Sequence, residues 1–130
     1  MTGADTNILV RFLTRDDEGQ FNKALAFIKR EAVFIPDTVW LETEWVLRYA
    51  NDFDRVAIAK AFRDLLGLPK IHVQDKIRLR LAIEWHTAGL DFADALHLAG
   101  SQETDAFATF DQSFVRGAAT LGRSRVVQLK

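Results

Sequence analysis

The sequence predicts an α/β fold, a three-layer α/β/α sandwich built on a short parallel sheet. Short apolar runs alternate along the chain with longer segments whose apolar residues recur at helical spacing. Short strands separated by helices pair in parallel through crossover connections, and the helices then cover both faces of the sheet. The 130 residues, 48% of them hydrophobic, suit one compact domain over residues 1–130.

Each element is predicted from apolar periodicity and from the residues that punctuate it. In the predicted helices apolar residues repeat every three or four positions, with Asp or Thr before them or Gly after them as caps. The predicted strands are short apolar runs, one of which ends at Pro36. Residues 77–83 also alternate like a strand, but Leu81 and Trp85 fit one helical stripe and Gly89 follows. In order, we expect a short segment at 1–4, a helix at 21–28, a strand at 32–35, helices at 38–50 and 54–67, a strand at 71–73, helices at 75–88 and 91–101, and strands at 106–109 and 126–129.

Composition excludes several classes of protein. The net charge of -1 gives no overall basic field of the kind that nucleic-acid binders carry. The chain has no cysteine, which removes disulfides, thiolate metal sites and thiol nucleophiles. Asp5 and Arg11 interrupt the stretch that would form the apolar part of a signal peptide, and no segment approaches the roughly 20 apolar residues of a membrane span. We therefore expect a cytoplasmic protein without membrane contact.

The charges are unevenly distributed along the chain. Between Leu81 and Val115 there is no Lys or Arg, although this stretch contains Glu84, Asp91, Asp94, Glu103, Asp105 and Asp111. Carboxylates without internal counter-ions attract an external one, commonly a hard divalent cation bound through oxygen. The charged residues after Asp111 are all basic: Arg116, Arg123, Arg125 and Lys130. A cation site beside a surface that tolerates polyanions would explain this pattern, but ordinary solvated faces explain the basic tail equally well.

Four carboxylates lack a neighbouring cation in the sequence: Asp5, Glu42, Asp94 and Asp111. Asp5 and Asp111 each follow a predicted strand, and ligands of parallel sheets bind beyond the carboxyl ends of the strands. These two acids are therefore expected at the same rim of the sheet. Each of them also precedes a helix start, so that capping remains an alternative role for each.

Glu42 and Glu44 are predicted to have different environments. Glu44 has Arg48 four residues later, the spacing of a solvated surface ion pair. Glu42 shares a helical stripe with apolar residues and has no cation within reach, which predicts a core-facing carboxylate that needs a metal or a distant partner. Asp91 and Asp94 would share a helical face; Asp91 could simply cap the helix, whereas Asp94 has His97 rather than a cation as its other neighbour.

At these motifs the chain resembles the PIN-domain ribonucleases, specifically the VapC-type toxins of bacterial toxin–antitoxin pairs. The resemblance runs in order over nearly the whole chain, with motif acids at Asp5, Glu42, Asp94 and Asp111 within residues 5–10, 42–47, 91–99 and 109–114. Residues 1–4 are shorter and less β-prone than the usual lead-in strand. The resemblance implies a small α/β/α domain, often dimeric, that cleaves RNA with Mg²⁺ or Mn²⁺ and pairs with a VapB-type antitoxin whose segment occupies the toxin's groove.

The resulting hypothesis assigns the metal to Asp5, Glu42, Asp94 and Asp111. A water molecule activated by the metal would attack the phosphodiester in line, and the resemblance implies 5′-phosphate and 3′-hydroxyl products. Ligands would be oriented by Thr6, Asn7 and Thr109. Phosphate contact by Arg11, Arg15 or Arg116 stays open beside a plain surface role for these arginines.

Two other functions are considered. A metal-dependent phosphatase that forms an aspartyl-phosphate needs a second Asp two residues after its nucleophile, and that position holds Asn7. A non-catalytic interaction module on the same scaffold would have no need to keep all four acids. The metal-dependent ribonuclease therefore remains the preferred hypothesis.

Overall fold

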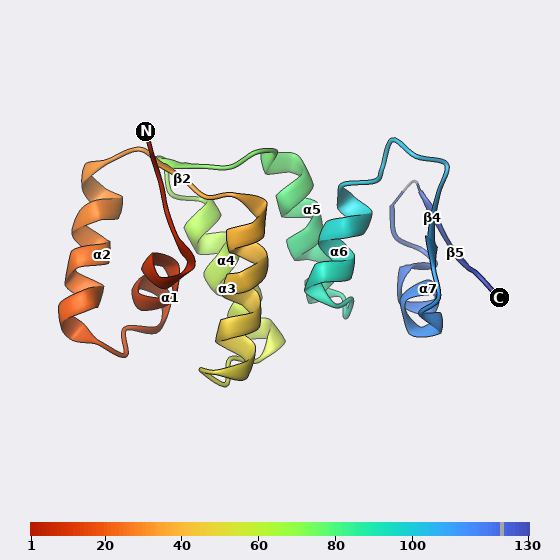
Figure 1. Cartoon of the computed structure of the whole chain (residues 1–130), viewed down its shortest axis with the longest axis horizontal. Coiled ribbons are helices and arrows are strands. Elements are labelled where there is room, and N and C mark those ends of the chain that lie inside the picture. Colours follow the sequence, from red (N-terminus) through yellow and green to blue (C-terminus); the bar gives the residue numbers. More distant parts are fainter. Residues whose placement is uncertain (123) are drawn as a thin grey trace. The chain divides into compact units, whose positions relative to one another are not determined.

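The computed structural model of the chain describes residues 1–122 and 124–130. The chain divides into two compact units, Met1–Lys76 and Ile77–Lys130. The first unit contains β1 (Thr2–Gly3), α1 (Thr6–Thr14), α2 (Glu18–Arg30), β2 (Val33–Phe34), α3 (Asp37–Tyr49), α4 (Arg55–Leu66) and β3 (Ile71–His72) (Figure 1). The second contains α5 (Lys76–Thr87), which begins at the last residue of the first unit, α6 (Phe92–Ala99), β4 (Ala106–Thr109), α7 (Gln112–Ala118) and β5 (Arg125–Gln128).

The sheet of the first unit is parallel and has the order β1-β2-β3. Val33 in the central strand pairs with Thr2 on one side and with Ile71 on the other. Each strand is only two residues long, and most of the buried apolar residues of the unit lie on the helices that connect the strands. This arrangement places Asp5 immediately beyond the carboxyl end of β1.

Helices α1 and α3 are central to the packing of the first unit. α1 contacts both α2 and α3, and α3 contacts α4. Trp40 of α3 and Phe62 of α4 are fully buried and meet edge to face, with ring centroids 5.0 Å apart. Edge-to-face contacts of this kind add to the hydrophobic burial of the two rings. The packing therefore fixes α3, and with it Glu42, relative to the remainder of the unit.

The second unit is built on the parallel pair β4-β5, whose register runs from Ala106 opposite Arg125 to Thr109 opposite Gln128. α7 packs on both strands. The ring of Phe107 in β4 stacks on that of His97 in α6, with ring centroids 6.4 Å apart. It also lies beside the ring of Phe114 in α7, with ring centroids 5.7 Å apart. These aromatic contacts join α6, β4 and α7, the three elements next to the acids of this unit.

The predicted α/β class with short parallel strands is confirmed, and every predicted strand and helix occurs within a few residues of its expected bounds. The described strands lie in two separate parallel sheets. Helix α5 confirms the helical interpretation of residues 77–83 over the strand alternative. For helices α1 and α7 the sequence predicted only a helix start, after Asp5 and after Asp111, and no range. Within residues 1–122 and 124–130, no helix has the length and apolar content needed to cross a membrane.

Candidate metal centre

In the first unit, Thr6 connects the two predicted site acids. Asp5 is the N-cap of α1, and its Oδ1 accepts a 2.7 Å hydrogen bond from the backbone N–H of Thr6. The hydroxyl of the same Thr6, which is buried, donates a hydrogen bond to Oε1 of Glu42 on α3. Asp5 and Glu42, 37 positions apart in the sequence, are thus held on either side of one residue. The predicted role of Thr6 in orienting a site carboxylate agrees with this contact.

The predicted orientations of Glu42 and Glu44 were wrong. Glu42 is exposed, whereas Glu44 is only 2% exposed and receives two hydrogen bonds from Arg48, at 2.8 and 3.2 Å. The ion pair between Glu44 and Arg48 is therefore present, but its carboxylate lies inside the protein. The prediction took the wrong side of α3 as the buried one. The buried residues of this helix are Trp40, Thr43, Glu44 and Leu47.

The carboxylate of Asp94 in the second unit lies in an environment that disfavours its charge. Asp94 is half-buried in the first turn of α6. Burial raises its pKa, the charges of Asp91 and Asp111 raise it further, and His97 opposes them. Asp91 is the N-cap of α6 and accepts a 3.2 Å hydrogen bond from the Asp94 N–H, as its capping interpretation predicted. A cation near Asp94 would relieve this repulsion.

Asp111 follows β4 and caps α7. Its Oδ1 accepts hydrogen bonds from the Ser113 hydroxyl at 2.7 Å, from the Ser113 N–H at 2.9 Å and from the Phe114 N–H at 3.2 Å. These donors, led by the Ser113 hydroxyl, lower the pKa of Asp111. The hydroxyl of Thr109 accepts a 3.0 Å hydrogen bond from the Asp111 N–H. Sequence reasoning missed Ser113, although a turn-forming Asp commonly accepts a hydrogen bond from the backbone N–H two residues later.

Asp5 and Asp111 both cap helices, and each cap uses only one oxygen of the carboxylate. Asp5, Glu42 and Asp111 each use a single carboxylate oxygen in the contacts above, and the Asp94 carboxylate accepts no hydrogen bond from the described residues. Among residues 1–122 and 124–130, none of the four forms an ion pair with Lys or Arg. Carboxylate oxygens without protein partners are the ligands that hard divalent cations prefer.

The four acids fall into two pairs, one in each unit. Asp5 and Glu42 belong to the first, and Asp94 and Asp111 to the second. In the part of the chain that the structure describes, no group of three or more His, Asp and Glu side chains is arranged to hold a metal ion. Assembly of all four carboxylates into one centre, and a common rim for Asp5 and Asp111, therefore stay predictions.

Short parallel strands, crossover helices and strand-end carboxylates with free oxygens together define an α/β protein with acidic sites suited to divalent cations. The PIN domain family matches residues 4–119, and the chain belongs to that family. PIN domains are generally metal-dependent nucleases that use divalent ions. No curated protein matches the sequence.

Proposed function

We propose that this protein is a metal-dependent endoribonuclease in which residues 1–130 act as one domain. Mg²⁺, or Mn²⁺, would be shared by Asp5, Glu42, Asp94 and Asp111, as one or two ions. The proposal rests on one observation about these carboxylates. Each keeps an oxygen without a protein partner, and none forms an ion pair with Lys or Arg among the described residues, although the charge of Arg116 contributes to the lowered pKa of Asp111. Membership of the PIN domain family supports the nuclease activity.

When bound, a divalent ion would lower the pKa of a water molecule and offset negative charge on the phosphate. The residues of the chain would supply orientation. Thr6 aims the Glu42 carboxylate from α3, and the Ser113 hydroxyl with the Phe114 N–H holds one oxygen of Asp111, so that the other oxygen faces away from the cap. Preset ligands of this kind reduce the ordering needed when metal and substrate bind.

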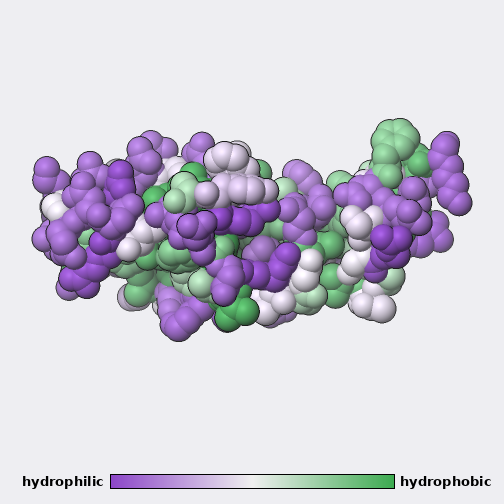
Figure 2. All heavy atoms as spheres, turned by 90° about the horizontal axis from the view of Figure 1, so that it is seen from below, coloured by the Kyte–Doolittle hydropathy of each residue, from purple (hydrophilic) through white to green (hydrophobic). Residues whose placement is uncertain are grey.

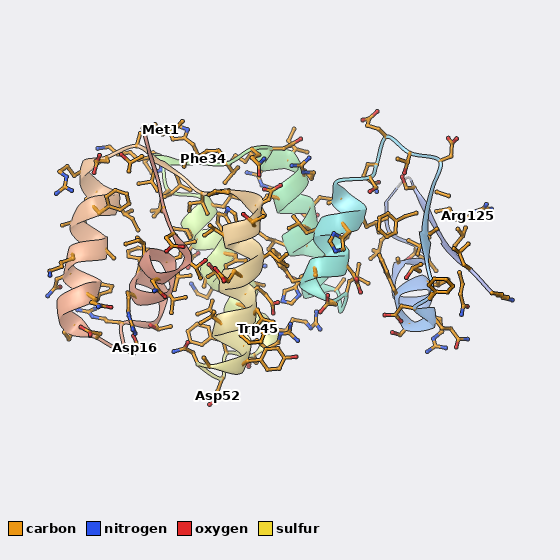
Figure 3. All side chains as sticks on the ribbon, in the orientation of Figure 1. Met1, Asp16, Phe34, Trp45, Asp52 and Arg125 are labelled. Atoms are coloured by element: carbon orange, nitrogen blue, oxygen red, sulfur yellow. The ribbon has the colours of Figure 1, made fainter. Side chains whose placement is uncertain are left out.

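A second part of the proposal concerns biological role. The ordered VapC-like motifs support a toxin that cleaves RNA in the cytoplasm, acts as a homodimer and is inhibited by a VapB-type antitoxin. Of the three tryptophans, Trp40 and Trp85 are buried, whereas Trp45 on α3 is 57% exposed and lies beside Tyr49, with ring centroids 5.1 Å apart (Figure 3). An exposed aromatic pair is typical of protein contact surfaces and supports a partner at this helix.

The proposal is tested with the purified chain and transfer, messenger and ribosomal RNA, each incubated with Mg²⁺, with Mn²⁺ and with EDTA. Metal-dependent cleavage that leaves 5′-phosphate and 3′-hydroxyl ends is expected, and Asp94→Asn should remove it. Hydrolysis of a small phosphate monoester without RNA cleavage would favour the phosphatase alternative. Absence of both activities, together with retained folding, would favour an interaction module. Rescue of growth by a co-expressed upstream antitoxin would test the toxin role separately.

A further inference from the structure

The first unit has a polar hollow between α1 and α2. The hollow has a volume of about 310 Å³ and is lined by Asn7, Ile8, Arg11, Gln20, Lys23 and Ala24. Asn7 and Arg11 are one helical turn apart on α1, about 6 Å along its axis. Asn7 lies in the first turn of α1, at the end of the helix that Asp5 caps, and Arg11 lies further along the same helix. The hollow contains no carboxylate in its lining.

The polar groups of this hollow are available to a ligand. The side chains of Asn7, Gln20 and Lys23 form no hydrogen bond or ion pair among residues 1–122 and 124–130. Arg11 uses Nη1 in a 2.9 Å contact with Asp16 and keeps the other donors of its guanidinium group. Asp16 lies in the turn between α1 and α2 (Figure 3). Its contact orients Arg11, one of the residues that line the hollow. Ile8 and the buried Ala24 supply an apolar floor.

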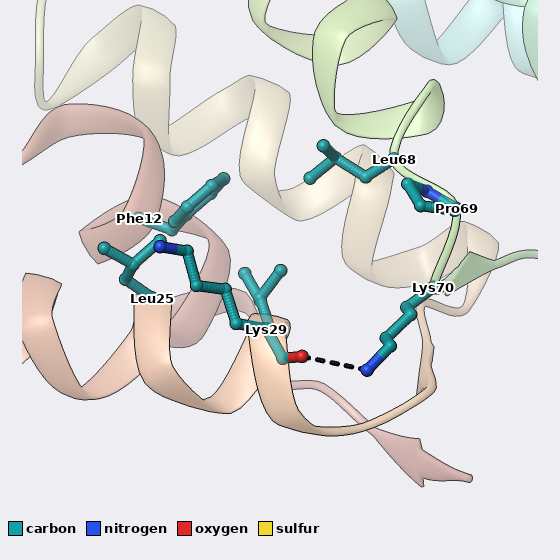
Figure 4. A pocket seen from close by; sticks show the side chains of 7 residues that line it. Phe12, Leu25, Lys29, Leu68, Pro69 and Lys70 are labelled. Carbon is teal, nitrogen blue, oxygen red and sulfur yellow. Dashed lines mark hydrogen bonds between the residues drawn. The ribbon is translucent and has the colours of Figure 1, made fainter.

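A second hollow of the same unit is lined mainly by apolar residues, unlike the polar hollow between α1 and α2. Phe12, Leu25, Ile28, Leu68 and Pro69 line it, together with Lys29 and Lys70. Its walls are almost entirely apolar, and Lys70 donates a 3.0 Å hydrogen bond to the Lys29 carbonyl, which belongs to the end of α2 (Figure 4). Hydrophilic residues dominate the outer surface at the end of the unit where α2 lies (Figure 2). The hollow between α1 and α2 instead combines amides and cations that keep unused hydrogen-bond donors.

We propose that the hollow between α1 and α2 binds the nucleotide adjacent to the scissile bond of a single-stranded RNA. Lys23 and Arg11 contact its phosphate, and Asn7 and Gln20 hydrogen-bond the polar edges of its base, which lies on Ile8. Cations beside amides and an apolar floor match the three parts of a nucleotide, since single-stranded RNA is read through unstacked bases and phosphate contacts. This inference rests on the proposed ribonuclease function, because it assigns a substrate subsite to the same centre.

The test measures binding without cleavage. Labelled oligo(A), oligo(C) and oligo(U) are titrated with the full chain carrying Asp94→Asn, in EDTA and at several salt concentrations. Lys23→Gln is then added to this background. Lys29→Gln is the matched control, because it changes an exposed lysine of the same helix that lines the apolar hollow instead. Thermal melts of each variant establish that the fold is retained.

Loss of a phosphate contact weakens binding uniformly across sequences, whereas loss of a base contact changes sequence preference. Lys23→Gln is therefore expected to lower affinity about 5-fold for all three RNAs and to reduce the slope of log affinity against log salt by about 0.7. Gln20→Ala is expected to change the ranking of the three RNAs, and Lys29→Gln to leave affinity within about 2-fold.

Equal effects of Lys23→Gln and Lys29→Gln, or no effect of either, would overturn the subsite. Failure of the proposed function has a different result. A wild-type chain that neither cleaves nor binds RNA would remove both proposals. A chain that cleaves RNA with metal, and whose Lys23→Gln variant binds RNA as tightly as its parent, would remove the subsite alone.

Discussion

The hydroxyl of Thr6 at the start of α1 donates a hydrogen bond to the carboxylate of Glu42 on α3. This contact holds Glu42 next to the residue whose N–H binds Asp5, so that one buried threonine positions two acids of the proposed centre. Thr6→Val keeps the size of the side chain and removes the donor. We expect cleavage to fall about 10-fold, in the range found when partners that orient metal ligands are lost.

Two controls accompany Thr6→Val. Thr6→Ser restores the hydroxyl and is expected to recover most of the cleavage activity. The concentration of Mg²⁺ that gives half-maximal cleavage should rise in Thr6→Val and return in Thr6→Ser, a response that loss of packing alone would not give. Unchanged metal dependence in Thr6→Val would show that the contact has no role in the site.

Asp94 and Asp91 give a matched pair of substitutions on α6. Asp94→Asn should abolish cleavage, because it removes a proposed metal ligand. Asp91→Asn should retain cleavage, because Asn caps helices about as well as Asp and the cap contact to the Asp94 N–H can persist. Circular dichroism should show an unchanged helix content in both. Equal losses of activity in the two variants would mean that Asp91 also belongs to the centre.

The raised pKa of Asp94 makes stability depend on pH and metal. A carboxyl whose pKa is higher in the folded than in the unfolded state contributes stability below its unfolded pKa, and this contribution is lost as pH rises through the folded pKa. Because burial and the charges of Asp91 and Asp111 raise the pKa of Asp94, ionised Asp94 destabilises the metal-free protein at neutral pH. Asp94→Asn should therefore increase the Tm at pH 7 in EDTA and have a smaller effect near pH 4.

Bound metal should offset the destabilisation caused by ionised Asp94 in the same melts. Millimolar Mg²⁺ is expected to raise the Tm of the wild-type chain, since a ligand that binds only the folded state stabilises it. The increase should shrink in Asp94→Asn. A wild-type Tm that does not respond to Mg²⁺ or Mn²⁺ would contradict the proposed metal centre.

The ion pair of Glu44 and Arg48 supports α3 rather than the chemistry. The side chain of Glu44 is 3% exposed and that of Arg48 is 38% exposed. Arg48→Ala leaves a buried carboxylate without its partner and should lower the free energy of unfolding by about 2–3 kcal/mol. Glu44→Gln leaves the arginine partly in solvent and should cost only about 1 kcal/mol. Urea unfolding measures the free energy of unfolding of both variants. Equal losses, or a larger loss in Glu44→Gln, would show that the burial of Glu44 does not determine the cost of breaking the ion pair.

Local patterns in the sequence were sufficient for most of the elements and for the capping roles of Asp5, Asp91 and Asp111. Helical periodicity and caps are properties of neighbouring residues, so α2 to α6 were predictable, as were the strands. Asp5 and Asp111 were expected beyond strand ends or at helix starts, and they occupy both positions. Asp91 was expected as a cap, which leaves Asp94 as the acid of that helix without a capping role.

The tertiary structure alone decided which side of α3 is buried. Apolar residues occur on two stripes of this helix, one with Val39 and Val46 and the other with Trp40 and Leu47. Periodicity cannot choose between them, because the choice depends on what α1 and α4 place against the helix. In the folded protein the side with Trp40 and Leu47 is buried. Glu44 therefore points inward, whereas Glu42 lies on the outer side, where it meets the Thr6 hydroxyl.

The sequence by itself determined the residue types of the site and the elements that carry them. Only the tertiary structure decided that the Thr6 hydroxyl meets Glu42, that Ser113 holds Asp111, and that α1 and α2 leave a polar hollow between them. The physical reason is the separation in sequence of the residues that interact. Caps and helices follow from contacts within a few residues, whereas contacts between elements depend on the packing of side chains that are distant in the chain.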